Sequence, residues 1–317
     1  MRAAIILGLG LSPQKLKQFA QLSDASWQLG LPATCSDADT IVILGGDGTV
    51  HRHLPQLVKL QLPVLVVPHG SGNDFARALS IHSVGDAMNA WCQFASGVNS
   101  DMKNVCRIDL GTISPIPDPS ASLSPGVNDK HGCYFCCVGG VGLDAEVARR
   151  ANQLPRAVRR HGGYLLSLLP TLSSFHPLAV RVQMSEVQAS RVMNDDDHSH
   201  VLEPKHDGLV TLVAFANTPT FGGGMRIAPK ARLDDGKLDI CVVGSMARVR
   251  LLRLLPSVYS GRHLNLPEVK YFQAERLRIE SEKPSEVYAD GEFVCHTPVD
   301  VTVERAALPV IVPGTPS

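Results

Sequence analysis

The first part of the chain alternates continuous apolar runs with segments of helical periodicity. The runs are typical of strands buried on both faces of a parallel sheet, and they cover residues 3–9, 40–44 and 63–67. Helices are predicted over 13–22, directly after residue 49, and from residue 75 to 79. Because strand, loop and helix repeat in this order, the pattern predicts a parallel sheet covered by helices.

Beyond residue 112 the pattern changes to short strand-like runs. Residues 114–132 are rich in Pro, Ser and Gly and have no periodicity, which is typical of a loop or linker. The later runs are 133–138, 178–184, 209–216, 237–243, 276–281, 285–289, 292–296 and 299–303, and helical spacing occurs over 143–153 and 156–173.

These patterns predict two domains. A parallel-sheet α/β domain is expected over 1–112 and a mainly β domain over 113–317, with the functional site in the cleft between them. The pattern leaves open whether the last residues of the chain return to the first domain. The length of 317 residues is enough for two hydrophobic cores.

Composition excludes several classes of protein. Hydrophobic residues make up 44% and charged residues 19% of the chain, which is typical of a globular protein and excludes disorder. Lys plus Arg equals Asp plus Glu at 30 each, and aromatic residues make up only 5%, so no nucleic-acid partner is expected.

The eight cysteines predict a reducing, cytoplasmic compartment, because a chain of this size and apolar content does not need disulfides. Cys133, Cys136 and Cys137 lie in CYFCCVGG, which is interpreted as a buried strand, since no matching second pair follows to complete a zinc site. The opening MRAAIILGLGL is interpreted as a strand and not a signal segment, and no run approaches the ~20 apolar residues of a spanning helix.

A glycine-rich loop, GGDGT at 45–49, follows the second apolar run and begins a helix. Such a turn gathers backbone N–H groups and a helix N-terminus, which attract phosphate, and glycine lets the backbone come close to the anion. A tight turn in which Asp47 or Thr49 caps the helix explains the same spacing, and the loop alone leaves both readings open.

A second polar loop, PHGSGND at 68–74, follows the next apolar run. Ser71, Asn73 or Asp74 could be a helix cap, but two such loops at the ends of consecutive parallel strands indicate a ligand crevice. The chain has no Walker A sequence and no HRD or DFG set, so neither of the two large kinase classes fits.

GGDGT at 45–49 with PHGSGNDFAR at 68–77 resembles the diacylglycerol kinase catalytic-domain family, bacterial lipid kinases that are also similar to sphingosine kinases. Four further blocks occur in the family's order: RIDLG at 107–111, GGVGLDAEV at 139–147, NTPTFGGGMRIAPKARLDDGKLDI at 217–240 and YADGEF at 288–293. NAD kinases share GGDGT, whereas GSGNDFAR and APKARLDDGKLD separate the two families.

The resemblance implies an ATP- and Mg²⁺-dependent kinase that phosphorylates the hydroxyl of a membrane lipid such as diacylglycerol. An NAD kinase-like enzyme and a non-catalytic nucleotide- or lipid-binding module are the alternatives. The partners implied are a lipid alcohol and a transient contact with the membrane surface from the cytoplasm. The oligomeric state is left open, with a homodimer as one option.

The resemblance also assigns roles to individual residues. ATP would bind along Gly45, Gly46, Asp47, Gly48, Thr49, Val50, His51, Ser71, Gly72 and Asn73. Glu292 would accept the proton of the lipid hydroxyl, and Asp74 would face the nucleotide and its metal. Mg²⁺ would be held by the Asp235 carboxylate and the main-chain oxygens of Arg232 and Lys237, with Asp109 supporting that site, and such oxygen donors suit a hard cation.

Two of these blocks also have a purely structural explanation. Asp290-Gly291 lies between VYA and EFV, which is the commonest signature of a hairpin turn, and Asp235-Gly236 before KLDICVV has the same form. Without the resemblance, both predict turns without chemistry.

The N-terminus departs from the family pattern. Only about thirty residues separate the first run from Thr40, where the family has a further strand-to-helix unit, so one helix is expected to be missing or shortened. Gly8 and Gly10 are candidates to replace the family's usual first loop.

A basic cluster next to an apolar segment suggests a membrane contact. Arg149, Arg150, Arg156, Arg159, Arg160 and His161 precede GGYLLSLLPTL. This stretch is either a docking surface for anionic lipid or a solvated helix face beside a core helix. The polar run NDDDHSH at 194–200 is interpreted as the tip of a solvated loop.

Overall fold

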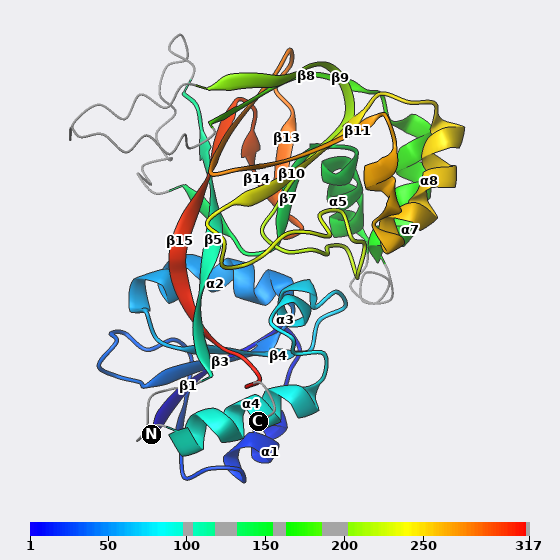
Figure 1. The fold of residues 1–317 in the computed structure, drawn as a ribbon. Coiled ribbons are helices and arrows are strands. Elements are labelled where there is room, and N and C mark those ends of the chain that lie inside the picture. Colours follow the sequence, from blue (N-terminus) through cyan, green and yellow to red (C-terminus); the bar gives the residue numbers. More distant parts are fainter. Residues whose placement is uncertain (98–103, 118–131, 155–162, 186–201, 315–317) are drawn as a thin grey trace, which may run out of the picture.

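The computed structural model describes residues 1–97, 104–117, 132–154, 163–185 and 202–314. The N-terminal part is built on parallel strands, as predicted (Figure 1). In spatial order these are β4 (Val64–Pro68), β3 (Thr40–Gly45), β1 (Arg2–Leu7) and β2 (Ser26–Leu29). Every residue of β3 is buried, because helices cover both faces of this sheet.

Helices follow the strands of this sheet. The longer ones are α2 (Asp47–Leu60) and α4 (Val84–Gly97), and α3 (Asp74–Ala78) is short. The predicted spacing holds for α2, whose Val50, Leu54 and Leu57 are fully buried. The sequence analysis missed α4, which packs Trp91 and Phe94 into the same core.

The first connection is short, as the departure from the family pattern predicted. It contains only the 3₁₀ turn η1 (Pro13–Leu16) and the single helical turn α1 (Lys17–Ala20) before β2. The helix predicted over 13–22 is therefore reduced to these two turns.

The second part is mainly antiparallel β, which confirms the predicted fold class (Figure 1). Its strands are β6 (Cys133–Phe135), β7 (Val138–Gly142), β8 (Leu178–Ser185), β9 (Glu203–Ala216), β10 (Leu238–Gly244), β11 (Val269–Ala274), β12 (Arg276–Ser281), β13 (Glu286–Ala289) and β14 (Glu292–His296). The run 133–138 is not one strand, because the backbone N–H groups of Cys136 and Cys137 leave the sheet to bind Asp290.

Three helices and one 3₁₀ turn pack on one side of these strands. They are α5 (Leu143–Gln153), α7 (Gly163–Ser174), α8 (Arg248–Ser260) and η2 (Arg262–Asn265). The bounds of α5 agree with the predicted helix over 143–153. Of the helix predicted over 156–173, residues 163–173 lie in α7, and 155–162 lie outside the described residues, as does the run 194–200. The sequence analysis missed α8.

Two long strands connect the two parts. β5 (Val105–Pro115) and β15 (Val299–Ile311) pair antiparallel from Val299 opposite Pro115 to Ile311 opposite Val105. In Figure 1 they run side by side from one part into the other, and the end of β15 pairs with β4 through Val310 and Val64. The chain's last described strand thus reaches the N-terminal sheet, and the predicted boundary at residue 112 falls inside β5.

The Asp109 carboxylate fixes the bend in β15. One oxygen accepts the backbone N–H of Ala306 at 2.7 Å, and the other accepts the N–H of Gly236 at 2.7 Å. The register of β15 against β5 shifts between Glu304 and Leu308, and Ala306 lies in the left-handed region at φ 50°. Asp109 is 3% exposed, so its loss would leave two N–H groups without an acceptor.

We predict that Asp109→Ala lowers the free energy of unfolding by about 2–4 kcal/mol, since each unpaired N–H costs about 1–3 kcal/mol. Urea denaturation of both proteins measures this difference. Asp207→Ala is the control, because it breaks an exposed ion pair with Arg181 and should cost less than about 1 kcal/mol. Equal losses in the two variants would show that Asp109 does not hold the bend.

Candidate active site

A cleft of about 550 Å³ opens between the two parts of the molecule. The N-terminal part contributes the loops that follow β1, β3 and β4. The second part contributes one face of α5, the hairpin of β13 and β14, residues 221–223 and Tyr259. Of the sequence-predicted site residues, those that line the cleft are Gly45, Gly46, Asp47, Gly48, Thr49, Ser71, Gly72, Asp74 and Glu292.

The N-terminus of α2 opens into this cleft without a side-chain cap. Gly46 is the N-cap residue and offers no side chain as a cap, and among the described residues no side chain accepts a hydrogen bond from the N–H groups of Asp47, Gly48 or Thr49. The N–H groups of a first helical turn have no partner within the helix, and the helix dipole makes them a site for an anion. The first predicted phosphate loop therefore has a free helix end.

The N-terminus of α3, at the second predicted loop, is already capped. The Asp47 carboxylate accepts the backbone N–H of Asp74 at 3.1 Å and that of Phe75 at 3.0 Å. Burial, and then the charge of Asp74, raises the pKa of Asp47 to about 6. Asp47 thus occupies with its own carboxylate the position that a phosphate would take at α3.

Glycine is required at Gly46 and Gly70 by the contact between the two loops. A Cβ on Gly46 would lie 2.7 Å from Cα of Gly70, and a Cβ on Gly70 would lie 2.5 Å from Cα of Gly46. The backbones touch, and any side chain at either position would separate them. The sequence analysis attributed Gly46 to close approach of a ligand, but the nearest neighbour of this position is the other loop.

Three of the predicted nucleotide-contacting residues do not line the cleft. Val50 is fully buried in the core of the N-terminal part. The side chain of His51 faces Asp290, and Asn73 folds back to exchange two hydrogen bonds with Gly70. These three residues therefore lie outside the lining of the cleft, and their contact with a nucleotide stays a prediction.

Asp74 links the second loop to the second part of the molecule. Its carboxylate accepts a hydrogen bond from the guanidinium of Arg77 at 2.6 Å and another from the backbone N–H of Gly223 at 2.9 Å. It is 3% exposed. Asp74 therefore holds the glycine loop 222–224 against the cleft.

Asp290 anchors the hairpin that carries Glu292. Asp290 and Gly291 have φ values of 50° and 83°, so the predicted hairpin turn is present. The fully buried Asp290 carboxylate accepts the N–H groups of Cys136 and Cys137 at 2.9 and 2.8 Å, and His51 Nδ1 lies 3.0 Å from its Oδ2. The turn thus has a second role, which is to fix the hairpin to α2.

His51 is the cationic partner of Asp290. Burial lowers the pKa of His51, but the hydrogen bond to Asp290, a hydrogen bond to Cys133 and the Asp290 charge outweigh it and raise the pKa to about 10. At neutral pH the imidazolium and the carboxylate form a buried ion pair whose remaining oxygen lone pairs are satisfied by backbone N–H groups.

Glu292 begins β14 directly after this turn and is exposed to the cleft. A Cβ on Gly48 would lie 3.3 Å from Glu292 Oε1, so the carboxylate lies over the first turn of α2. The N-terminus of α2 and a solvent-accessible carboxylate therefore lie beside each other at the cleft, which is an arrangement suited to an anion and a general base.

The predicted metal residues lie apart from the cleft. None of Arg232, Asp235, Lys237 and Asp109 lines it. Asp235 Oδ1 accepts the backbone N–H of Lys237 at 3.1 Å. Burial raises the pKa of nearby Asp239, and the charge of Asp235 is one of the further causes. A bound cation would relieve the repulsion between the Asp235 and Asp239 carboxylates. Carboxylate and carbonyl oxygens, which this loop offers, are the donors that a hard ion such as Mg²⁺ prefers.

Cys136, Cys137 and Asp290 form the one group of potential side-chain metal ligands within the part of the chain that the structure describes. Burial raises the pKa of Cys136 to about 12 and raises the pKa of Cys137 well above its usual value, which disfavours the thiolates that a metal needs. The Asp290 oxygens also accept three hydrogen bonds, from two backbone N–H groups and the His51 imidazole. The cluster of Cys136, Cys137 and Asp290 therefore fits a structural role.

The sequence analysis missed several residues of the cleft, among them Leu9, Arg52, Asn152, Tyr259 and the glycines 222–223. Arg52 carried a usable signal, because it stands three positions after Thr49 on the helix that begins at the glycine loop. Tyr259 carried none, since it belongs to the missed helix α8.

Comparison with known proteins gives two family models that together cover most of the chain. Residues 19–106 match the diacylglycerol kinase catalytic domain, and residues 138–312 match the YegS C-terminal NAD kinase beta sandwich-like domain. A diacylglycerol kinase of Mycobacterium tuberculosis is 30% identical over 291 residues, which are 89% of this chain and 79% of that protein. A diacylglycerol kinase of Bacillus subtilis is 24% identical over 263 residues, 82% of this chain and 73% of the relative.

A solved structure shows the same fold. The crystal structure of a diacylglycerol kinase from Bacillus anthracis has a TM-score of 0.65 and 21% sequence identity, and the match covers 98% of this chain and 96% of that one.

We predict that the His51–Asp290 pair stabilises the protein below neutral pH and loses this effect in alkali. A histidine whose pKa is raised by folding contributes stability that is fully present below its unfolded pKa of 6.5 and is lost as the pH rises to about 10. His51→Gln should therefore lower the free energy of unfolding by about 3 kcal/mol at pH 6 and by much less at pH 10.

Denaturation at a series of pH values measures this. His53→Gln is the matched control on the same helix, because the pKa of His53 is lowered by burial and by Arg52. Like the wild type, the His53→Gln variant should still lose stability as the pH rises to about 10. A pH-independent difference between wild type and His51→Gln would contradict the ion pair.

Proposed function

The chain belongs to the diacylglycerol kinase family, and we propose on that basis that it transfers the γ-phosphoryl group of ATP to the hydroxyl of a membrane lipid such as diacylglycerol. The observation that carries the proposal is the N-terminus of α2, which has no side-chain cap from its N-cap residue and lies beside the Glu292 carboxylate in the cleft. One element attracts phosphate, and the other can accept a proton.

The phosphates of ATP would lie at the first turn of α2. The backbone of Gly45 to Thr49 would supply N–H donors there, and the Ser71 hydroxyl lines the same cleft. Arg52 is exposed at the cleft and would add a positive charge near the γ-phosphate. In this arrangement Asp47 shapes the site by capping α3 and does not contact the nucleotide.

Glu292 would take the proton of the lipid hydroxyl as its oxygen attacks the γ-phosphorus and ADP leaves. The carboxylate is exposed and stands on a hairpin fixed by Asp290, so it can be reached by a substrate and does not need to move far. Mg²⁺ bound with the nucleotide would neutralise charge on the phosphate oxygens. Asp74 is the carboxylate of the cleft nearest to the glycine loop 222–224 and would position that loop beside the nucleotide.

The activity can be tested with purified protein, Mg-ATP and a panel of acceptors. Radiolabelled product should appear with diacylglycerol or another lipid alcohol and not with NAD. Phosphorylation of NAD alone would replace the proposal with an NAD kinase-like activity. Tight ATP binding without turnover of any acceptor would indicate a non-catalytic binding module.

We predict that Glu292→Gln lowers kcat by about 10²–10⁴-fold, the usual effect of losing a general base, and leaves ATP affinity and the melting temperature unchanged. Glutamine keeps the size of the side chain but cannot accept the hydroxyl proton. Steady-state kinetics at saturating ATP and lipid, calorimetric titration with ATP, and a melting curve measure the three quantities.

Glu286→Gln is the matched control, because this glutamate lies on the same hairpin and faces Arg149 instead of the cleft. It should keep near-normal kcat. Near-normal kcat in Glu292→Gln as well would remove Glu292 from the mechanism and leave Asp74 as the next carboxylate to test.

We predict that Mg²⁺ raises the melting temperature of the wild type and that Asp235→Ala abolishes this increase. A ligand that binds only the folded state stabilises it by mass action, and Asp235 offers the carboxylate of the proposed site. Thermal melts over a Mg²⁺ series without nucleotide provide the measurement. Asp234→Ala is the control, since the neighbouring carboxylate is exposed and paired with Arg232. A Mg²⁺ response that survives in Asp235→Ala would place the ion elsewhere.

A further inference from the structure

Helix α8 leaves much apolar surface uncovered. None of its residues is buried, although its sequence, RVRLLRLLPSVYS, is largely apolar. Leu251 and Leu255 turn towards the molecule and pack against a small cluster that includes Leu168 and Leu172 of α7. On other faces of the helix, Val249 is 60% and Leu252 42% exposed.

Helix α7 has the same division. Leu168 and Leu172 are buried in the cluster shared with α8, whereas Leu166 is 57% and Leu169 60% exposed. Five of the ten exposed large apolar side chains within the described residues belong to these two helices, which pack against each other, so the exposure is concentrated on this helix pair.

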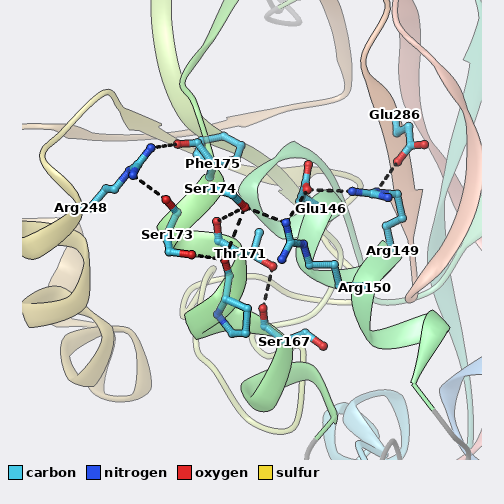
Figure 2. A network of polar contacts seen from close by, with 11 residues as sticks. Glu146, Arg149, Arg150, Ser167, Thr171, Ser173, Ser174, Phe175, Arg248 and Glu286 are labelled. Carbon is cyan, nitrogen blue, oxygen red and sulfur yellow. Dashed lines mark hydrogen bonds and ion pairs between the residues drawn. The ribbon is translucent and has the colours of Figure 1, made fainter.

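The two helices are held to each other and to α5 by polar contacts (Figure 2). The Arg248 guanidinium donates to the carbonyls of Ser173 at 2.5 Å and Phe175 at 3.2 Å, which ties the start of α8 to the end of α7. Because Arg248 ties α8 to α7, the exposed apolar side chains of the two helices belong to a fixed pair.

The same contacts change the interpretation of the basic cluster that precedes α7. Arg149 lies 2.8 Å from Glu146 and 3.6 Å from Glu286, and Arg150 donates to Ser174 at 2.7 Å (Figure 2). These two arginines are therefore engaged within the molecule. The other members of the cluster, Arg156, Arg159, Arg160 and His161, lie outside the described residues.

The charge of this face is positive. Residues 244–267 contain four arginines and no Asp or Glu, and α7 carries no charged residue. Glu268 pairs with Arg250 at 2.7 Å. Arg253 and Arg262 are exposed, and neither guanidinium forms an ion pair within the described part of the chain. Positive charge beside exposed leucines complements a surface that is both anionic and apolar.

We propose that this surface, the α7–α8 face (Leu166, Leu169, Val249, Leu252 and Arg253), docks on the surface of an anionic lipid bilayer. The inference rests on the proposed function, because it names the place at which the enzyme meets its substrate. No helix among the described residues is long and apolar enough to cross a membrane. A basic, partly apolar helix lying in the interface binds through both its leucines and its arginines.

The face is continuous with the mouth of the cleft. Tyr259, near the C-terminal end of α8, is 43% exposed and also lines the cleft. Docking through α8 therefore brings the bilayer surface next to the opening that leads to Glu292. A lipid hydroxyl at the level of the headgroups would enter without the lipid leaving the membrane entirely.

Co-sedimentation with vesicles tests this surface. Wild type should bind vesicles made of equal parts phosphatidylglycerol and phosphatidylcholine, and the double variant Leu252→Asp/Arg253→Glu should bind them at least about tenfold more weakly. The matched control is Leu29→Asp/Lys59→Glu, which makes the same kinds of change at an exposed leucine and an exposed lysine of the N-terminal part and should bind normally.

Two further measurements separate this inference from the proposed function. The α7–α8 variant should keep wild-type ATP affinity and wild-type turnover of a short-chain diacylglycerol presented in solution, and it should lose turnover only of long-chain diacylglycerol in vesicles. Equal binding of vesicles by all three proteins would overturn the docking face even if the kinase activity is present. Vesicle binding that depends on this face, without turnover of any lipid, would instead contradict the proposed function alone.

A second copy of the chain is the alternative occupant of the face. Sedimentation velocity should give the same molecular mass for wild type and the α7–α8 variant. A wild-type dimer that the double variant dissociates would assign the face to self-association and overturn the membrane proposal.

Discussion

The geometry of the site depends on the contacts that the buried carboxylate of Asp290 makes. This carboxylate lies in the turn of a hairpin from the second part of the molecule, and it faces His51 on α2, the helix that follows the first glycine loop. Two backbone N–H groups complete its coordination. A buried ion pair contributes little net stability when both charges must lose water, but loss of one partner leaves an uncompensated charge in the core. The pair therefore acts chiefly to fix one arrangement, in which Glu292 lies over the first turn of α2.

The two glycine loops have different tasks although their sequences look alike. Both precede helices, and each helix N-terminus attracts an anion. At α3 that anion belongs to the protein, since Asp47 reaches across from the first loop to cap it. At α2 no side chain among the described residues accepts a hydrogen bond from the first turn, although the Glu292 carboxylate lies close to it. The contact of Gly46 with Gly70 brings the two loops close enough for Asp47 to cap α3. The N-terminus of α3 is thereby satisfied within the protein, and the N-terminus of α2 stays available to a ligand.

Local patterns predicted several parts of the fold whose side chains are buried, although α4, which buries Trp91 and Phe94, was missed. The continuous runs at 40–44 and 63–67 became β3 and β4, and the spacing after residue 49 became α2, because burial on a fixed face is what periodicity records. Helix α8 was missed for the converse reason, since it has no buried residue. Glu292 was assigned through the resemblance alone, whereas the roles of Asp47 and Asp290 depend on contacts between residues far apart in the chain. No local pattern reports that Asp290 meets His51, which stands 239 positions earlier.

The loop with Asp235 shows why a motif shared with a family does not locate a residue in the cleft. Asp109 binds the N–H of Gly236 in this loop and also the N–H of Ala306 at the bend of β15. β15 in turn pairs with β5 and reaches β4 of the N-terminal sheet. An ion held by Asp235 would therefore act on the connection between the two parts of the molecule, at a distance from the phosphates. Its effect on turnover would follow from its effect on that connection, whereas a cation bound with the nucleotide would act on the transferred group itself. If Mg²⁺ binds at both places, as we propose, its effect on stability and its effect on catalysis would be separate and carried by different parts of the structure.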